Sequence, residues 1–135
     1  MPRLPDSYDV ASGFAPVKPS AIWEQIRDLE NWPGYFPGWI ASVEAGDDRF
    51  TATGPSREKF DMYPHSDAEN RALDVEIVDE LGSADTLRLR LLDMPGGTLV
   101  IAAHGKLSGS GEAAWAAKRD SIAEGVAELA SKIDV

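Results

Sequence analysis

Apolar side chains recur at helical spacing between Trp115 and Ile133, near the C-terminus. At about 100° per residue these positions fall on one narrow stripe, the acidic residues fall on the opposite side, and no proline interrupts the run. The pattern predicts one helix of about 30 Å, from the region of Ser110 to the end, that covers an apolar surface. The stripe consists of Trp115, Arg119, Ile122, Val126, Leu129 and Ile133.

Most of the chain before this helix alternates between apolar and polar residues, which is the period of a strand with one buried face. Clusters of glycine, proline and aspartate separate the runs. Strands joined by tight turns are mostly antiparallel, so the pattern predicts an antiparallel sheet with one covered face and one wet face. Strands are expected at 8–15, 40–45, 50–53, 58–65, 72–80, around 87–91 and at 98–107.

The alternation also predicts which side of each strand faces the core. In the first strand we expect the side that carries Tyr8, Val10 and Phe14 to face the core. In the last strand we expect the side that carries Leu99 and Ile101 to do so. The other inward positions are Phe60, Met62, Leu73, Val75, Ile77, Leu87, Leu89 and Leu91.

The segment between the first two strands is helical and aromatic. After Pro19, apolar residues at helical spacing predict a short helix that ends near Asp28, and Pro33 can start a single turn after it. Three of the four tryptophans lie between Trp23 and Trp39. Large aromatic side chains here suit either the wall of a pocket or ordinary core packing. Core packing is favoured for Trp23, whereas the two roles are evenly balanced for Tyr35 and Trp39, which flank Pro37-Gly38.

Composition excludes several classes of protein. The 135 residues suit one domain over 1–135, with 1–7 as a loose lead-in, and a hydrophobic fraction of 43% suits a real core. A net charge of −10 argues against binding to nucleic acid or to an anionic membrane surface. Cysteine is absent, which excludes disulfides and thiolate chemistry. Without an apolar leader or a membrane-length apolar run, a cytoplasmic protein is expected.

Several motifs together resemble the START-like helix-grip superfamily, also called SRPBCC, in its polyketide cyclase/dehydrase and lipid-transport-like branch. They are the segment 19–28, the triplet 31–33, the segment 36–40, the Gly97-Thr98 entry to the last strand and the terminal helix. The resemblance implies an α+β fold in which a seven-stranded antiparallel sheet curves around the C-terminal helix, with two short helices after the first strand. It also implies a cavity for a hydrophobic small molecule, and it transfers no catalytic residue.

Arg119 stands out because a guanidinium is costly to bury unpaired. The favoured interpretation is structural: the side chain reaches the sheet edge or pairs with an acid. The alternative is that it holds a carboxylate or phenolate of a ligand in the cavity. In the second case Arg119→Leu weakens an acidic ligand and preserves the fold. The candidate ligand-binding residues are Tyr35, Trp39, Phe60, Met62, Leu89, Trp115, Arg119 and Ile122.

Other chemistry has little support in the sequence. His65 and His104, the only histidines, lie on the polar sides of their strands and are expected in solvent, and no metal-ligand spacing occurs. We therefore expect no metal, no cofactor and no catalytic residue. The favoured function is binding or transport of a hydrophobic small molecule by a monomer or homodimer. The alternatives are a cyclase or dehydratase acting on an aromatic substrate and a protein-interaction module of the chaperone co-activator type.

Overall fold

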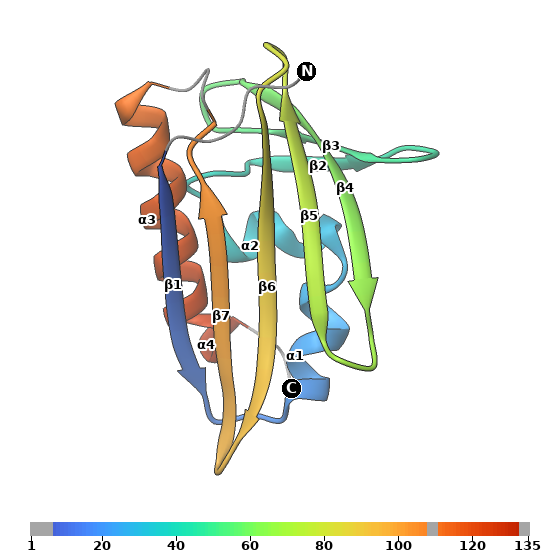
Figure 1. The fold of residues 1–135 in the computed structure, drawn as a ribbon, viewed down its shortest axis with the longest axis vertical. Coiled ribbons are helices and arrows are strands. Elements are labelled where there is room, and N and C mark those ends of the chain that lie inside the picture. The colour runs from blue at the N-terminus through green and yellow to red at the C-terminus, as the bar shows by residue number, and fades with distance from the viewer. Residues whose placement is uncertain (1–6, 108–110, 133–135) are drawn as a thin grey trace.

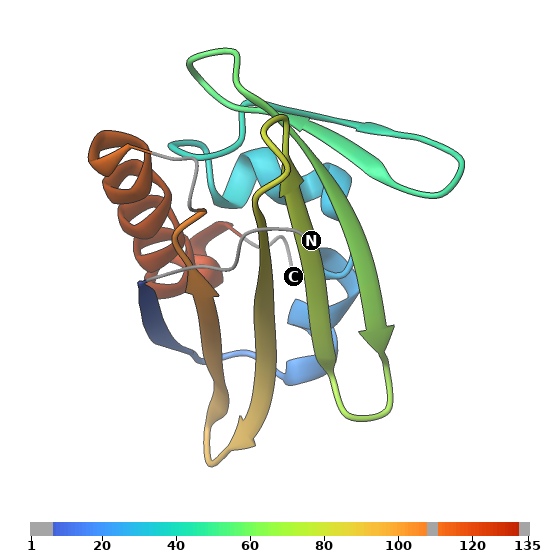
Figure 2. The same ribbon diagram turned by 45° about the horizontal axis from the view of Figure 1, so that its top comes forward.

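The computed structural model describes residues 7–107 and 111–132, which form one sheet with helices on one of its faces (Figures 1 and 2). The start of the predicted lead-in and Ile133, the last position of the predicted stripe, lie outside these residues. The elements are β1 (Tyr8–Ala15), α1 (Pro19–Ile26), η1 (Leu29–Asn31), α2 (Trp32–Tyr35), β2 (Ser42–Ala45), β3 (Phe50–Thr53), β4 (Lys59–Asp67), β5 (Ala72–Asp79), β6 (Ala84–Met94), β7 (Gly97–Gly105), α3 (Glu112–Ala127) and α4 (Leu129–Lys132).

The seven strands pair in the order β1-β7-β6-β5-β4-β3-β2, and every neighbouring pair is antiparallel. Two short helices follow β1, and the long helix α3 near the C-terminus packs against β1 and β7. The predicted α+β helix-grip architecture is thereby confirmed. The predicted C-terminal helix is divided, because α3 ends at Ala127 and a short turn, α4, follows Glu128.

The middle of the sheet follows the predicted alternation. Asp74 and Arg88 face outward and form an ion pair across β5 and β6, with 2.7 Å between the oxygen and the nitrogen. The opposite face is the core, where the inward side chains of β4, β5 and β6 are covered by the helices. The predicted positions Phe60, Met62, Leu73, Val75, Ile77, Leu87, Leu89 and Leu91 are all buried.

The prediction for β1 is wrong. Tyr8, Val10 and Phe14 are 70%, 67% and 51% exposed, and the small residues on the other side of the strand face the core. The cause is the close approach of α3, because a Cβ added to Gly13 would lie 2.4 Å from the backbone oxygen of Val126. Only glycine fits beneath a helix backbone at this distance.

The prediction for β7 is also wrong. Leu99 and Ile101 are only partly buried, whereas Val100 and Ala102 are buried to 1% and 0% exposure. Residues that pair across antiparallel strands share a face. Ala102 pairs with Leu89 of β6 on the inner face, and this register places the alternate residues of β7 outside.

Candidate functional site

A cleft of about 480 Å³ opens between the N-terminal half of α3 and the sheet, where β4 begins and β5 ends. A neighbouring hollow of about 600 Å³ lies between the same helix and the β3–β4 loop, and the two share Trp39, Glu58, Ala114 and Lys118 as lining residues. The apolar lining of the cleft consists of Trp39, Phe60, Leu81, Leu107, Ala114 and Trp115.

Two aromatic walls define the shape of this cleft. On one side Trp39 stacks on Phe60, with ring centroids 5.4 Å apart and planes at 7° to one another. The second wall is Trp115, which comes from the first half of α3. Trp39 and Trp115 are each 6% exposed, so the walls are held in place by the surrounding protein. Flat apolar walls of this kind suit a planar, hydrophobic guest.

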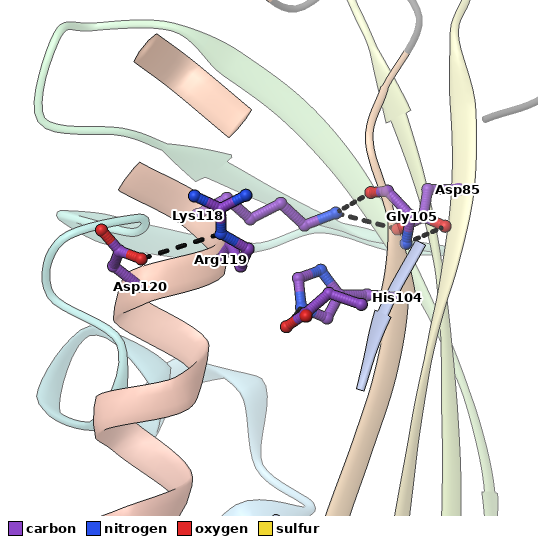
Figure 3. A network of polar contacts seen from close by, with 7 residues as sticks. Asp85, His104, Gly105, Lys118, Arg119 and Asp120 are labelled. Atoms are coloured by element: carbon purple, nitrogen blue, oxygen red, sulfur yellow. Dashed lines mark hydrogen bonds and ion pairs between the residues drawn. The ribbon is translucent and has the colours of Figure 1, made fainter. Parts of the chain in front are cut away.

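Lys118 is the buried charged group of the cleft lining (Figure 3). Its Nζ donates hydrogen bonds to Asp85 Oδ2 at 2.8 Å and to the backbone oxygen of Gly105 at 2.7 Å. The same Asp85 accepts the Gly105 N–H at 2.9 Å, so the three residues connect α3, β6 and β7. Nζ also lies 5.4 Å from the ring centroid of Trp39 and 5.8 Å from that of Trp115, within the range of cation–π attraction.

Burial opposes the charged form of Lys118. It lowers the pKa of the ammonium below its ordinary value, although the carboxylate of Asp85 acts in the opposite direction. With side chains 5% and 2% exposed, the two residues form a buried acid–base pair within direct proton-transfer distance.

The prediction that His104 lies in solvent is wrong. Its ring lies beneath Trp115, with 5.4 Å between the two ring centroids. Its side chain is fully buried, and neither ring nitrogen has a hydrogen-bond partner among the described residues. Desolvation lowers its pKa to about 4, helped by the positive charges of Lys118 and Arg119 and opposed by Asp85. The imidazole is therefore neutral at pH 7, and its 3.8 Å approach to Asp9 is not an ion pair there. The other histidine, His65, is exposed as predicted.

The mouth of the cleft is acidic. Glu58, Asp79 and Glu80 line it, against the single exposed base Lys59. Asp79 Oδ1 also accepts the backbone N–H groups of Leu81 and Ser83, both at 2.9 Å, which fixes the β5–β6 turn at the mouth. This arrangement favours neutral over anionic guests.

Seven of the eight predicted ligand-binding residues divide between cleft and core. Trp39, Phe60 and Trp115 line the cleft, as described above. Tyr35 is also buried, but its hydroxyl donates to Gln25 Oε1 at 3.0 Å, and burial raises the pKa of this hydroxyl above its ordinary value. The remaining three apolar candidates, which belong to the hydrophobic core, are Met62, Leu89 and Ile122.

Arg119 does not line the cleft. Its side chain is 42% exposed, its Nε lies 3.8 Å from Asp120, and its guanidinium lies 5.7 Å from the centroid of the Trp115 ring. Lys118 was not among the residues predicted from the sequence. At about 100° per residue it lies about 60° from Trp115 on the helix surface, outside the predicted stripe, whereas Arg119 lies about 40° from Trp115 within it.

Comparison of the fold with solved structures gives consistent matches. A START superfamily protein from Mycobacterium smegmatis superposes with a TM-score of 0.70 at 14% identity, over 94% of this chain and 97% of that chain. Ara h 8.0201 superposes with a TM-score of 0.62 at 15% identity, over 92% and 97% of the two chains. DynU16, a protein of the dynemicin biosynthetic locus, gives a TM-score of 0.63 at 14% identity, over 96% of this chain and 49% of that chain.

The chain has the START-like helix-grip fold. No protein-family model and no curated protein matches the sequence, so the assignment of the fold rests on the three-dimensional arrangement. Within the described residues, no helix is long and apolar enough to cross a membrane.

Proposed function

We propose that this protein binds a neutral, hydrophobic small molecule with a planar or aromatic part, in the cleft between α3 and the sheet. The observation that carries the proposal is the aromatic lining, which consists of Trp39 stacked on Phe60 together with Trp115. A volume of about 480 Å³ lies within the usual range for small-molecule sites. The acidic mouth supports the choice of a neutral guest.

We propose a carrier or sensor role in the cytoplasm, in which the bound molecule is released unchanged. Binding in this role depends on filling the cleft. The role predicts that a guest extracted from the denatured complex has the mass of the guest that was added.

The test uses N-phenyl-1-naphthylamine, a neutral aromatic fluorophore whose emission rises in apolar surroundings. Ala114 lines the cleft and is exposed, so Ala114→Trp fills the cleft without disturbing the core. Ala123 is exposed on α3 and does not line the cleft, so Ala123→Trp is the matched control. We expect Ala114→Trp to weaken binding by about tenfold or more, equivalent to about 1.4 kcal/mol, and Ala123→Trp to change it less than about twofold.

Two results would contradict this proposal. In the first, the unaltered protein shows no saturable emission change with the fluorophore, which would remove the evidence for an apolar site. In the second, Ala114→Trp and Ala123→Trp bind equally well, which would place the fluorophore outside the cleft.

A further inference from the structure

Lys118 is a primary amine on the wall of an aromatic cleft, and the binding of an apolar guest does not require an amine there. Its side chain is 5% exposed, and burying a charged pair brings a desolvation cost that leucine or methionine would avoid. The link between α3 and the sheet could equally be made by apolar packing. The combination of a buried amine, an adjacent carboxylate and aromatic walls points to covalent chemistry with the guest.

We propose that Lys118 is a carbonyl-reactive amine that captures an aromatic aldehyde or ketone in the cleft as a reversible imine. This inference rests on the proposed function, since it uses the same cleft and the same aromatic walls, and it adds the chemical class of the guest.

The hydrogen bonds of Lys118 leave one direction open at Nζ. Two of its three hydrogen positions are directed at Asp85 and at the backbone oxygen of Gly105. Within residues 7–107 and 111–132 no further acceptor lies within hydrogen-bond distance for the third. A neutral amine that keeps both hydrogen bonds presents its lone pair in this third direction, and the two indoles that line the cleft flank the nitrogen.

Asp85 is placed to move the protons that imine formation requires. The amine lone pair forms a C–N bond to the carbonyl carbon, and the carbonyl π electrons move to oxygen. Asp85 Oδ2, at 2.8 Å from Nζ, accepts a proton from nitrogen and returns it to that oxygen, which gives the carbinolamine. Loss of the hydroxyl group as water, with the second proton from nitrogen, leaves the C=N bond. Both hydrogens of the amine thus leave in one water molecule, and no oxidant or reductant is needed.

The surroundings favour this reaction over recognition of an anion. Burial lowers the pKa of Lys118, which increases the fraction of neutral, nucleophilic amine at pH 7. The lining carries three carboxylates, Glu58, Asp79 and Glu80, so a ligand carboxylate would meet like charges at the mouth. A neutral carbonyl compound meets no such repulsion, and its aromatic part fits between the walls.

The experiment traps the imine in the unaltered protein with 2-naphthaldehyde and sodium cyanoborohydride at about pH 7.5, where an amine of ordinary pKa is almost fully protonated. The product is located by intact mass measurement and peptide mapping. Lys59 is an internal control, because it lines the same cleft but is exposed. We expect Lys118 to be modified at least about tenfold faster than Lys59, because burial lowers the pKa of Lys118 and so increases its neutral, nucleophilic fraction. The alcohol 2-naphthylmethanol, which cannot form an imine, should compete with this labelling.

A variant adds a second line of evidence. Lys118→Arg keeps a positive charge beside Asp85 but cannot form an imine with the aldehyde. Its fold is checked by circular dichroism, and we expect it to lose the saturable adduct while the exposed lysines react as before. The peptide map of the unaltered protein does not depend on this variant, so the test remains decisive even if the variant does not fold.

The outcomes separate this inference from the proposed function. If 2-naphthylmethanol binds in the cleft but trapping is spread evenly over the lysines, the imine is refuted and non-covalent binding stands. If neither naphthalene compound binds, both proposals fail. Saturable trapping at Lys118 that the alcohol blocks supports both.

Discussion

Replacing His104 by leucine should remove a large part of the pH dependence of folding. The imidazole is fully buried beneath Trp115, and its two ring nitrogens have no hydrogen-bond partner among the described residues. The charged groups near it are Asp9 on β1, Asp85 on β6, and Lys118 and Arg119 on α3. Burial dominates, so the folded protein resists protonation of this residue.

The magnitude follows from the pKa difference between the folded and unfolded chains. The pKa of His104 falls from 6.5 to about 4 on folding. Between these values the unfolded chain binds more protons, so stability is present above pH 6.5 and is lost as the pH falls towards 4. Within this window each step of about one pH unit removes about 1.4 kcal/mol, so the loss at about pH 5 is about 2 kcal/mol relative to about pH 8.

The assay is urea unfolding at about pH 8 and about pH 5, followed by tryptophan fluorescence. The free energy of unfolding of the unaltered protein should fall by about 2 kcal/mol more than that of His104→Leu. At the higher pH the variant should be within about 1 kcal/mol of the unaltered protein, since leucine has a similar volume and no unpaired nitrogen. His65→Gln is the matched control, because His65 is exposed on β4, and it should keep the original pH dependence.

An equal loss of stability on acidification in the unaltered protein and in His104→Leu would refute this reasoning. It would mean that His104 is protonated in the folded state as readily as in the unfolded chain. The buried position beneath Trp115 would then not govern its titration.

Three further predictions concern packing and charge. Lys118→Met should lower the free energy of unfolding by about 3 kcal/mol, because Asp85 is left buried without its cation, and adding Asp85→Asn should restore part of the loss in a urea melt. Gly125→Ala should destabilise the protein by more than about 2 kcal/mol, since the added Cβ would lie 2.4 Å from the backbone oxygen of Tyr35. In Gly34→Ala the added Cβ meets nothing within 4 Å, so this variant should stabilise its helix by up to about 1 kcal/mol. The melting temperatures of the two variants should therefore shift in opposite directions. Arg119→Leu should change stability by less than about 0.5 kcal/mol and leave N-phenyl-1-naphthylamine affinity intact, as measured by fluorescence titration, because this side chain is partly exposed and does not line the cleft.

Strands with an unambiguous polar side could be read from the sequence. In β5 and β6 the acidic and basic residues alternate with large aliphatic ones, and Leu73, Leu87 and Leu89 are buried as predicted. A charged side chain has a high desolvation cost when it is buried unpaired, so such an alternation has one stable orientation. The turn residues between the runs predicted the antiparallel pairing, because strands joined by tight turns run in opposite directions.

Only part of the candidate site could be predicted from the sequence. Aromatic residues of the cleft wall, such as Trp39 and Trp115, were identified by their size and position in the chain. Lys118 was missed because a lysine just outside an apolar helix stripe is expected to face solvent unless a buried acidic partner is known. That partner, Asp85, lies 33 positions earlier in the chain and is brought to Nζ by the pairing of β6 with β7.

The sequence by itself determined the element types, the antiparallel sheet and the long C-terminal helix, because these depend on local periodicity and turn residues. Tertiary structure alone decided which side of β1 and β7 is buried. Both sides of these strands carry apolar or small residues, so local patterning cannot choose between them. In β1 the choice was made by the close approach of α3 over Gly13, which leaves no room for a side chain at that position, and in β7 it was made by the register with β6.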